Sequence, residues 1–189
     1  MASSAAPPVF RIDGKTFERV YPLEVVQNKI ADLAHALNQS YEGKNPILLP
    51  IFTGAYMFFG ELVARITFPY QIMAMKLSSY GAGTESTGRP VVPEPHIPLA
   101  GRHIIVLEDI VDSGNTLMAL DEKLKAEGAA SIYYAALLFK PNSFQGTVPA
   151  HWVGFEIGNE FVIGYGLDYG EKGRHLRGIY QLTNDTQPV

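Results

Sequence analysis

The chain has 189 residues, a length that suits one domain with a full hydrophobic core and excludes two large domains. An apolar fraction of 47%, a charged fraction of 18% and the lack of cysteine are typical of a folded protein without disulfides. A net charge of −4 gives no basic footprint for nucleic acid, and no run approaches the roughly 18 apolar residues of a membrane span, so the composition favours a small-molecule partner.

The first half of the chain alternates helical and extended patterns. Residues 22–39 carry apolar side chains at roughly helical spacing and precede the polar, glycine-containing YEGKN, which predicts an amphipathic helix. An all-apolar run at 46–52 predicts a strand, and a turn at 53–55 separates it from a second helical pattern, YMFFGELVARI. Residues 71–79 predict another strand, followed by a loop over 80–100 that is rich in Gly, Ser, Thr and Pro. Loops of this length in compact domains are usually functional or mobile.

The alternation continues in the second half. Residues 102–108 predict a strand, residues 115–128 a helix that stops at a glycine, and residues 131–140 another strand. Strands and helices that alternate in this way predict an α/β fold, with a right-handed parallel sheet covered by helices.

The pattern changes beyond Pro141, where two short apolar strands, WVGFEI and FVIGYGL, are expected to form a small cap with the N-terminal strand PVFRI. We therefore expect a single domain over residues 1–189, with a core at about 20–145 and a cap at about 8–14 and 146–189.

The most informative stretch is IIVLEDIVDSGNTL, residues 104–117, in which a buried strand runs into three carboxylates. Ligands of open α/β sheets bind at the carboxyl ends of the strands, so this loop is placed to bind one. Its backbone N–H groups, with the N-terminus of the following helix, can surround a phosphate. The residues that would form this phosphate cradle are Asp112, Ser113, Gly114, Asn115 and Thr116. Glu108 and Asp109 cannot bind a phosphate, but they can accept hydrogen bonds from sugar hydroxyls. The stretch therefore predicts a site for a ribose phosphate.

Competing motifs do not fit the spacing. The chain lacks the GxxxxGK[ST] of a P-loop, and no GxGxxG opens a helix. A phosphatase with an aspartyl nucleophile would have two aspartates separated by one residue, whereas Asp109 and Asp112 are separated by two. A remaining alternative is that Asp112 or Ser113 only caps a helix. Three acids followed by S-G-N-T favour the ligand site over that alternative.

VLEDIVDSGNT resembles the phosphoribosyl-pyrophosphate-binding signature of type I phosphoribosyltransferases, and further matches narrow the resemblance to the hypoxanthine phosphoribosyltransferase family. The most specific matches are residues 104–116 and 161–174 (FVIGYGLDYGEKGR), supported by LLFKPNS at 137–143. Weaker likeness in IFTGAYMFF and KLSSY extends the resemblance over most of residues 46–182. It implies the type I phosphoribosyltransferase fold, a parallel-sheet core with a small cap called the hood.

The resemblance assigns roles within the central stretch. Glu108 and Asp109 would hold the ribose hydroxyls, and the loop from Asp112 to Thr116 would bind the 5-phosphate. Asp112 also matches the position that exchanges a proton with N7 of the purine, as general base or acid. A carboxylate beside a heterocyclic nitrogen suits that work.

The same resemblance implies a purine site built from later segments. Lys140 matches a lysine that donates to the purine O6, although alone it would read as a strand-end lysine reaching water. Phe161 matches an aromatic that stacks on the base, with the Val162 backbone reading the purine edge, or else Phe161 is only cap core. Asp168 matches an acid near the metal and the base, and Arg174 a residue that contacts pyrophosphate, or both are surface charges.

Two further elements follow from the family. Thr53 and Gly54 fall at the pyrophosphate-binding turn, where a cis peptide exposes backbone N–H groups. Many relatives have a lysine in place of Thr53, which puts a side-chain role there in doubt and leaves a backbone role. Ser79 and Tyr80 match the start of a mobile loop that closes over the reaction centre and excludes water, or else they begin a solvated linker.

The reaction implied is attack of a purine nitrogen on C1 of phosphoribosyl pyrophosphate. The pyrophosphate implies Mg²⁺ as cofactor, with Glu108, Asp109 and Asp168 as its candidate protein ligands. Mg²⁺ commonly keeps several waters and takes one or two carboxylates plus substrate oxygens.

Hypoxanthine, and guanine with it, is the expected purine. A xanthine-preferring relative stays open, because sequence does not fix the backbone around Val162 and Asp168. A regulatory protein that keeps the fold is a second alternative, although no basic segment is present to bind nucleic acid. The apolar surface of YMFF predicts a homodimer or homotetramer, and the lack of cysteine and of a secretory pattern in MASSAAPPVF predicts a cytoplasmic location.

Overall fold

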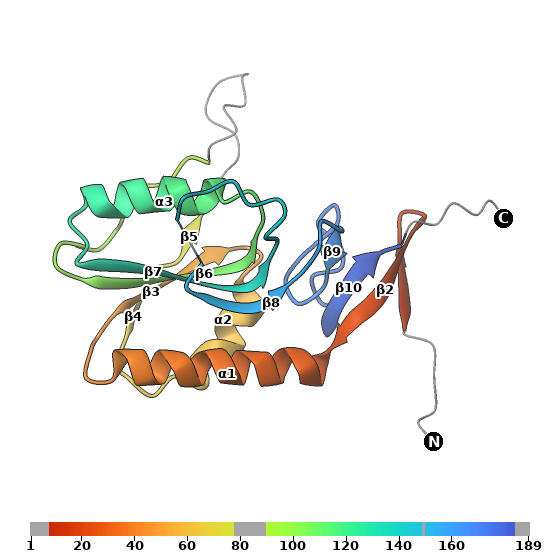
Figure 1. Ribbon diagram of the computed structural model, residues 1–189, viewed down its shortest axis with the longest axis horizontal. Coiled ribbons are helices and arrows are strands. Elements are labelled where there is room, and N and C mark those ends of the chain that lie inside the picture. Colours follow the sequence, from red (N-terminus) through yellow and green to blue (C-terminus); the bar gives the residue numbers. More distant parts are fainter. Residues whose placement is uncertain (1–7, 78–89, 149, 184–189) are drawn as a thin grey trace.

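The computed structural model describes residues 8–77, 90–148 and 150–183, which form two sheets and three helices (Figure 1). Ser79 and Tyr80, expected to begin a mobile loop, lie outside the described residues. No helix in the described part of the chain is long and apolar enough to cross a membrane.

The large sheet is parallel throughout, with the strand order β4, β3, β6, β7, β8. Its strands are β3 (Ile47–Phe52), β4 (Gln71–Ile72), β6 (His103–Val111), β7 (Ser131–Phe139) and β8 (Trp152–Glu156). The predicted single strand over 71–79 is replaced by two short ones, β4 and β5 (Met75–Lys76), which both pair with β3. The expected α/β fold with a parallel sheet is confirmed.

Helices cover both faces of this sheet. Figure 1 shows α1 (Leu23–Tyr41) and α2 (Tyr56–Val63) on one face and α3 (Asn115–Ala126) on the other. Strand β6 explains why: Ile105 and Leu107 pack in the cluster with α1 and α2, whereas Ile104 and Val106 pack in the cluster with α3. A strand buried on both faces reads as one apolar run, as IIVL does.

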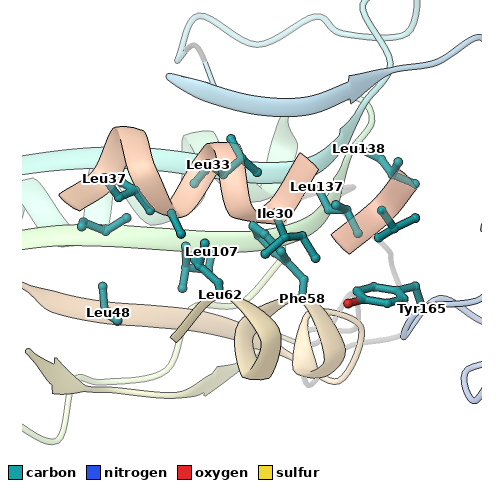
Figure 2. Packing of buried hydrophobic residues seen from close by; sticks show 14 of the residues in the cluster. Ile30, Leu33, Leu37, Leu48, Phe58, Leu62, Leu107, Leu137, Leu138 and Tyr165 are labelled. Atoms are coloured by element: carbon teal, nitrogen blue, oxygen red, sulfur yellow. The ribbon is translucent and has the colours of Figure 1, made fainter. Parts of the chain in front are cut away.

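A cap residue completes the core between α1, α2 and the sheet. Figure 2 shows Ile30, Leu33 and Leu37 of α1 in this cluster, which also contains Phe58 of α2. Tyr165, from the segment 161–174, is 2% exposed and belongs to the same cluster. That segment is therefore anchored in the core of the large sheet.

The small sheet is antiparallel, with the order β1, β2, β10, β9. Its strands are β1 (Val9–Ile12), β2 (Lys15–Pro22), β9 (Val162–Ile163) and β10 (Gly178–Leu182). Sequence reasoning missed β2, although Asp13-Gly14 is a common hairpin turn and both residues have positive φ here, 50° and 76°.

The expectation that WVGFEI would join the cap is wrong. This stretch forms β8 and pairs in parallel with β7, so the large sheet extends beyond residue 146. Hydrophobic periodicity identifies a strand but does not select its partner, and β7 offered the free edge. The single-domain assignment stays a prediction.

The arrangement gathers several turns at one edge of the large sheet. Strands β3, β6 and β7 are parallel neighbours that end at Phe52, Val111 and Phe139. Figure 1 shows the small sheet lying beyond this carboxyl edge. The segments that follow these three strands carry Thr53 and Gly54, the predicted phosphate cradle and Lys140.

Candidate active site

The acid pair lies near the end of β6, and its two members differ in burial. Glu108 is 6% exposed, and its Oε2 has no hydrogen-bond partner among the described residues. Burial, with the neighbouring Asp109 charge, raises the pKa of Glu108 well above its ordinary value. Burial likewise raises the pKa of Asp109 to about 6, although N–H groups of the backbone and the Arg174 charge oppose the rise. Both carboxyls are thus held without full compensation, as a site awaiting hydroxyl donors or a cation would hold them.

Asp109 lies against the turn that follows β3. The Phe52–Thr53 peptide bond is cis, as the family resemblance implied. A Cβ on Gly54 would overlap the carboxylate of Asp109, so only glycine leaves room for that side chain. The turn at Thr53 and Gly54 therefore touches the acid pair directly.

The same turn contacts the cap through a second glycine, which sequence reasoning missed. Gly166 has φ +103°, and a Cβ there would overlap the carbonyl oxygen of Gly54. The contact joins two segments more than one hundred residues apart in the chain, Gly54 and Gly166. The only sequence signal is the pair of glycines in GYG, which does not identify the partner.

The predicted phosphate cradle has the expected form. Gly114 adopts a left-handed conformation with φ 86° and ψ 0°, and α3 begins at the next residue. The Oγ of Ser113 accepts a hydrogen bond from the Asn115 N–H at 3.4 Å. The first-turn N–H groups of a helix have no intrahelical acceptor, and the dipole there favours an anion. The N-terminus of α3, including Thr116, thus opens at the carboxyl edge of the sheet.

An ion pair joins the cradle to the end of β7. The Lys140 ammonium donates to Oδ2 of Asp112 at 3.0 Å. Lys140 is 7% exposed, whereas the side chain of Asp112 is 52% exposed. The backbone N–H of Lys140 also donates to the Val111 carbonyl at 2.9 Å. The two residues predicted to read O6 and N7 of a purine are therefore in contact, although 28 positions separate them in sequence.

The segment after β9 carries a second charged pair. Arg174 contacts Asp168 at 2.8 Å, and it also donates to Glu171 and to the Gly166 carbonyl. The Arg174 charge lowers the pKa of Asp109 while the Asp168 charge raises it, so both lie within electrostatic range of the acid pair. Arg174 thus binds the loop whose Gly166 contacts the predicted pyrophosphate turn.

The remaining two predicted residues lie on the cap. Val162 is buried in β9 of the small sheet. Phe161 is 44% exposed, and its ring meets Tyr169 edge to face at 5.7 Å between centroids. An exposed aromatic face is available for stacking, so Phe161 is not simply cap core.

The fit of a magnesium ion can be judged from the carboxylates. No group of three or more His, Cys, Asp or Glu side chains able to hold a metal occurs among the described residues. Mg²⁺ does not require one, because it often takes one or two carboxylates, substrate oxygens and water. The buried carboxyl of Glu108 and the half-buried carboxyl of Asp109 both have raised pKa values, which suits a cation, while Asp168 is paired with Arg174.

We predict that Glu108→Gln raises the free energy of unfolding of the ligand-free protein, and does so more as the pH rises. Because the folded-state pKa of Glu108 lies above the unfolded value of 4.5, the folded state binds more protons than the unfolded state above that pH. The wild type therefore loses stability until the folded-state pKa is passed, and Gln does not titrate. Urea denaturation between about pH 5 and pH 8 measures the difference. A difference independent of pH would contradict the prediction.

Known proteins with a similar sequence or structure are phosphoribosyltransferases. A family model described as the phosphoribosyl transferase domain matches residues 18–170. The bifunctional protein TilS/HprT of Listeria innocua is 40% identical over 152 residues, or 80% of this chain, and the chain spans only 24% of that protein's length. The hypoxanthine-guanine phosphoribosyltransferase of Streptococcus thermophilus is 36% identical, with 83% of this chain and 88% of that one covered. A crystal structure of a hypoxanthine phosphoribosyltransferase from Staphylococcus aureus superposes with a TM-score of 0.82 at 34% identity, covering 91% of this chain and 94% of that chain.

Proposed function

The chain belongs to the phosphoribosyl transferase domain family, and on that basis we propose that it is a hypoxanthine phosphoribosyltransferase of purine salvage. It transfers the 5-phosphoribosyl group of phosphoribosyl pyrophosphate to N9 of hypoxanthine or guanine, giving IMP or GMP and pyrophosphate. The observation that carries this proposal is the Lys140–Asp112 pair beside the phosphate cradle, because it unites a purine-edge donor, a proton acceptor and an anion site.

The two side chains of this pair contact different atoms of the purine. The Lys140 ammonium donates to O6, and the Asp112 carboxylate accepts the N7 proton as N9 attacks C1 of the ribose. Pyrophosphate leaves with the electron pair of the broken C1–O bond. Without purine the two side chains satisfy each other, so the buried ammonium is never left unpaired. Phe161 stacks on the base, and the backbone at Val162, with Asp168 nearby, sets the selectivity at the 2-position.

The ribose phosphate lies between the acid pair and the cradle. Glu108 and Asp109 accept hydrogen bonds from the ribose hydroxyls, which supply the donors that Glu108 Oε2 lacks. Ser113, Gly114, Asn115 and Thr116 bind the 5-phosphate at the N-terminus of α3. Fixing the sugar at both ends orients C1 toward the purine, which is the main task when the transition state is oxocarbenium-like.

Pyrophosphate binds at the turn after β3. The backbone of Thr53 and Gly54, held between Asp109 and Gly166, presents N–H donors, and Arg174 adds a positive charge. Thr53 contributes through its backbone, because it lacks the charged side chain that the lysine of many relatives would place there. Mg²⁺, when bound by Glu108, Asp109 and the substrate, supplies positive charge that offsets the charge developing on the leaving pyrophosphate. Asp168 would be a further ligand, and its contact with Arg174 engages only one of its two carboxylate oxygens.

Lys140→Met is predicted to raise the KM for hypoxanthine by at least about tenfold, because a hydrogen bond to a charged group is worth about 1.5–3 kcal/mol. The KM for phosphoribosyl pyrophosphate should change less. Lys125→Met on the exposed face of α3, where the lysine side chain is 68% exposed, is the matched control. An unchanged KM for hypoxanthine in Lys140→Met would contradict the assignment of the O6 donor.

The proposed function is tested with phosphoribosyl pyrophosphate and Mg²⁺, offering hypoxanthine, guanine, xanthine and adenine in separate spectrophotometric assays. We expect turnover of hypoxanthine and guanine, with xanthine and adenine far slower. Preferential turnover of xanthine would identify a xanthine-preferring enzyme instead. Absence of turnover with all four bases would favour a regulatory binding protein.

An assembly and a cellular location are also proposed. Most of YMFF faces the core, since Phe58 is fully buried and Met57 and Phe59 pack against the same cluster. Only Tyr56, which is 40% exposed, remains of the apolar surface expected for a homodimer or homotetramer. Light scattering coupled to size-exclusion chromatography measures the oligomeric state. Cytoplasmic location, and closure of a loop that begins near Ser79 and Tyr80, stay predictions from the sequence.

A further inference from the structure

The loop after β7 carries Lys140 and also packs against the phosphate cradle. We call residues 140–146, KPNSFQG, the brace loop. It begins at Lys140, whose N–H donates to the carbonyl of Val111 at the end of β6. The loop then folds back, and the N–H groups of Ser143 and Phe144 donate to the Lys140 carbonyl, each at 3.2 Å. The brace loop is therefore a compact turn attached to the end of β6.

The first contact with the cradle is the ring of Phe144. A Cβ on Gly114 would overlap Cε2 of Phe144, so the ring fills the space that a side chain at Gly114 would need. The ring meets Phe139 edge to face at 5.3 Å between centroids and packs against the buried cluster that contains Val111 and Leu117. Phe144 thus wedges between the hydrophobic core and the left-handed turn of the cradle.

The second contact is a backbone hydrogen bond. The N–H of Gln145 donates to the carbonyl of Ser113 at 3.0 Å. This bond fixes the peptide unit between Ser113 and Gly114, whose own N–H is one of the donors available to an anion. Gly146 follows directly, and Phe144 crowds it too, since a Cβ there would lie 2.9 Å from Cζ.

We propose that Phe144 is a positioning residue for the ribose phosphate, and that the brace loop holds the cradle in its binding shape before the substrate arrives. The physical reason is preorganisation: a loop whose N–H groups are already aimed at the anion loses less conformational entropy on binding. The inference rests on the proposed function, because it takes the cradle to bind a 5-phosphate. Phe144 itself touches no substrate in this account.

Ribose 5-phosphate is the probe, because it occupies the cradle without purine or pyrophosphate. We expect Phe144→Ala to weaken its binding, measured by calorimetry, by at least about tenfold, and to raise the KM for phosphoribosyl pyrophosphate by a similar factor. The KM for hypoxanthine and kcat should stay within about threefold of the wild type, a split that general destabilisation would not produce. Phe144→Leu, which keeps apolar volume under Gly114, should recover most of the affinity.

A backbone pair of variants provides an independent test of the second contact. Gln145→Pro removes the N–H that Ser113 accepts, whereas Gln145→Ala keeps it, so only the proline variant should lose affinity for ribose 5-phosphate. Tyr133→Ala, an aromatic truncation near the opposite end of β7, controls for loss of packing. Circular dichroism and the unfolding midpoint check that each variant folds.

The outcomes distinguish failure of the proposed function from failure of the positioning role of Phe144. A wild type that neither binds ribose 5-phosphate nor turns over any purine would overturn the proposed function and this inference with it. A wild type that binds the probe, with Phe144→Ala and Gln145→Pro binding it equally well, would overturn the positioning role alone. Equal losses of affinity in Phe144→Ala and Tyr133→Ala would also overturn it.

Discussion

Asp112→Asn is expected to lower the rate of the chemical step at least about a hundredfold, because general acid–base catalysis typically contributes 10²–10⁴-fold. Asparagine keeps the size of the side chain and an oxygen for Lys140, but it cannot accept the N7 proton. Affinity for phosphoribosyl pyrophosphate should change little. A single-turnover experiment measures the step directly, which matters because product release limits kcat in many enzymes.

Asp32→Asn serves as the control, since Asp32 is an exposed acid on α1. If the single-turnover rate of Asp112→Asn stayed within a few-fold of the control, another group would have to accept the proton. Measuring hypoxanthine binding in the same variant distinguishes a lost base from a purine that no longer binds.

Gly166→Ala is expected to damage both stability and use of phosphoribosyl pyrophosphate. An alanine at φ +103° is strained by roughly 1–3 kcal/mol, and its Cβ would overlap the backbone carbonyl of Gly54, which cannot rotate away. The turn at Thr53 and Gly54 must then shift relative to Asp109. We expect the KM for phosphoribosyl pyrophosphate to rise at least about tenfold and the free energy of unfolding to fall, as measured by urea denaturation.

Gly170→Ala separates strain from steric contact. Gly170 also has positive φ, +56°, but a Cβ there would meet nothing within 4 Å. The two variants should share a loss of stability, and only Gly166→Ala should change the KM. Equal KM values in both would mean that the contact between Gly54 and Gly166 does not position the turn.

The parallel sheet could be predicted from the sequence because a strand that is buried on both faces appears as a continuous apolar run. The apolar run IIVL and the alternation of strand and helix patterns can be recognised without knowing which strands pair with each other. The hairpin of β1 and β2 was missed although Asp13-Gly14 marked it, because KTFERVYP alternates only partly and ends in a proline. The sheet membership of β8 was not predictable from periodicity, since strand pairing is a long-range choice.

In the candidate site, too, local features could be predicted from the sequence and contacts between distant segments could not. The cradle is local, so its small residues could be identified from one stretch of sequence, whereas the left-handed conformation of Gly114 came from the structure. Lys140 and Asp112 were assigned to one purine site only through family resemblance, because they follow different strands, and the ion pair between them was not predicted. The contacts of Phe144 with Gly114 and of Gly166 with Gly54 had no sequence signal beyond a glycine, which indicates a close approach but not by what.

Transfer of a phosphoribosyl group to a purine can be measured through its two products. The most direct measurement mixes the purified protein with hypoxanthine, phosphoribosyl pyrophosphate and Mg²⁺, and quantifies IMP by chromatography and pyrophosphate by a coupled assay. We expect equimolar IMP and pyrophosphate, with both products lost together in Asp112→Asn. Pyrophosphate released without IMP, or no product at all, would contradict this expectation.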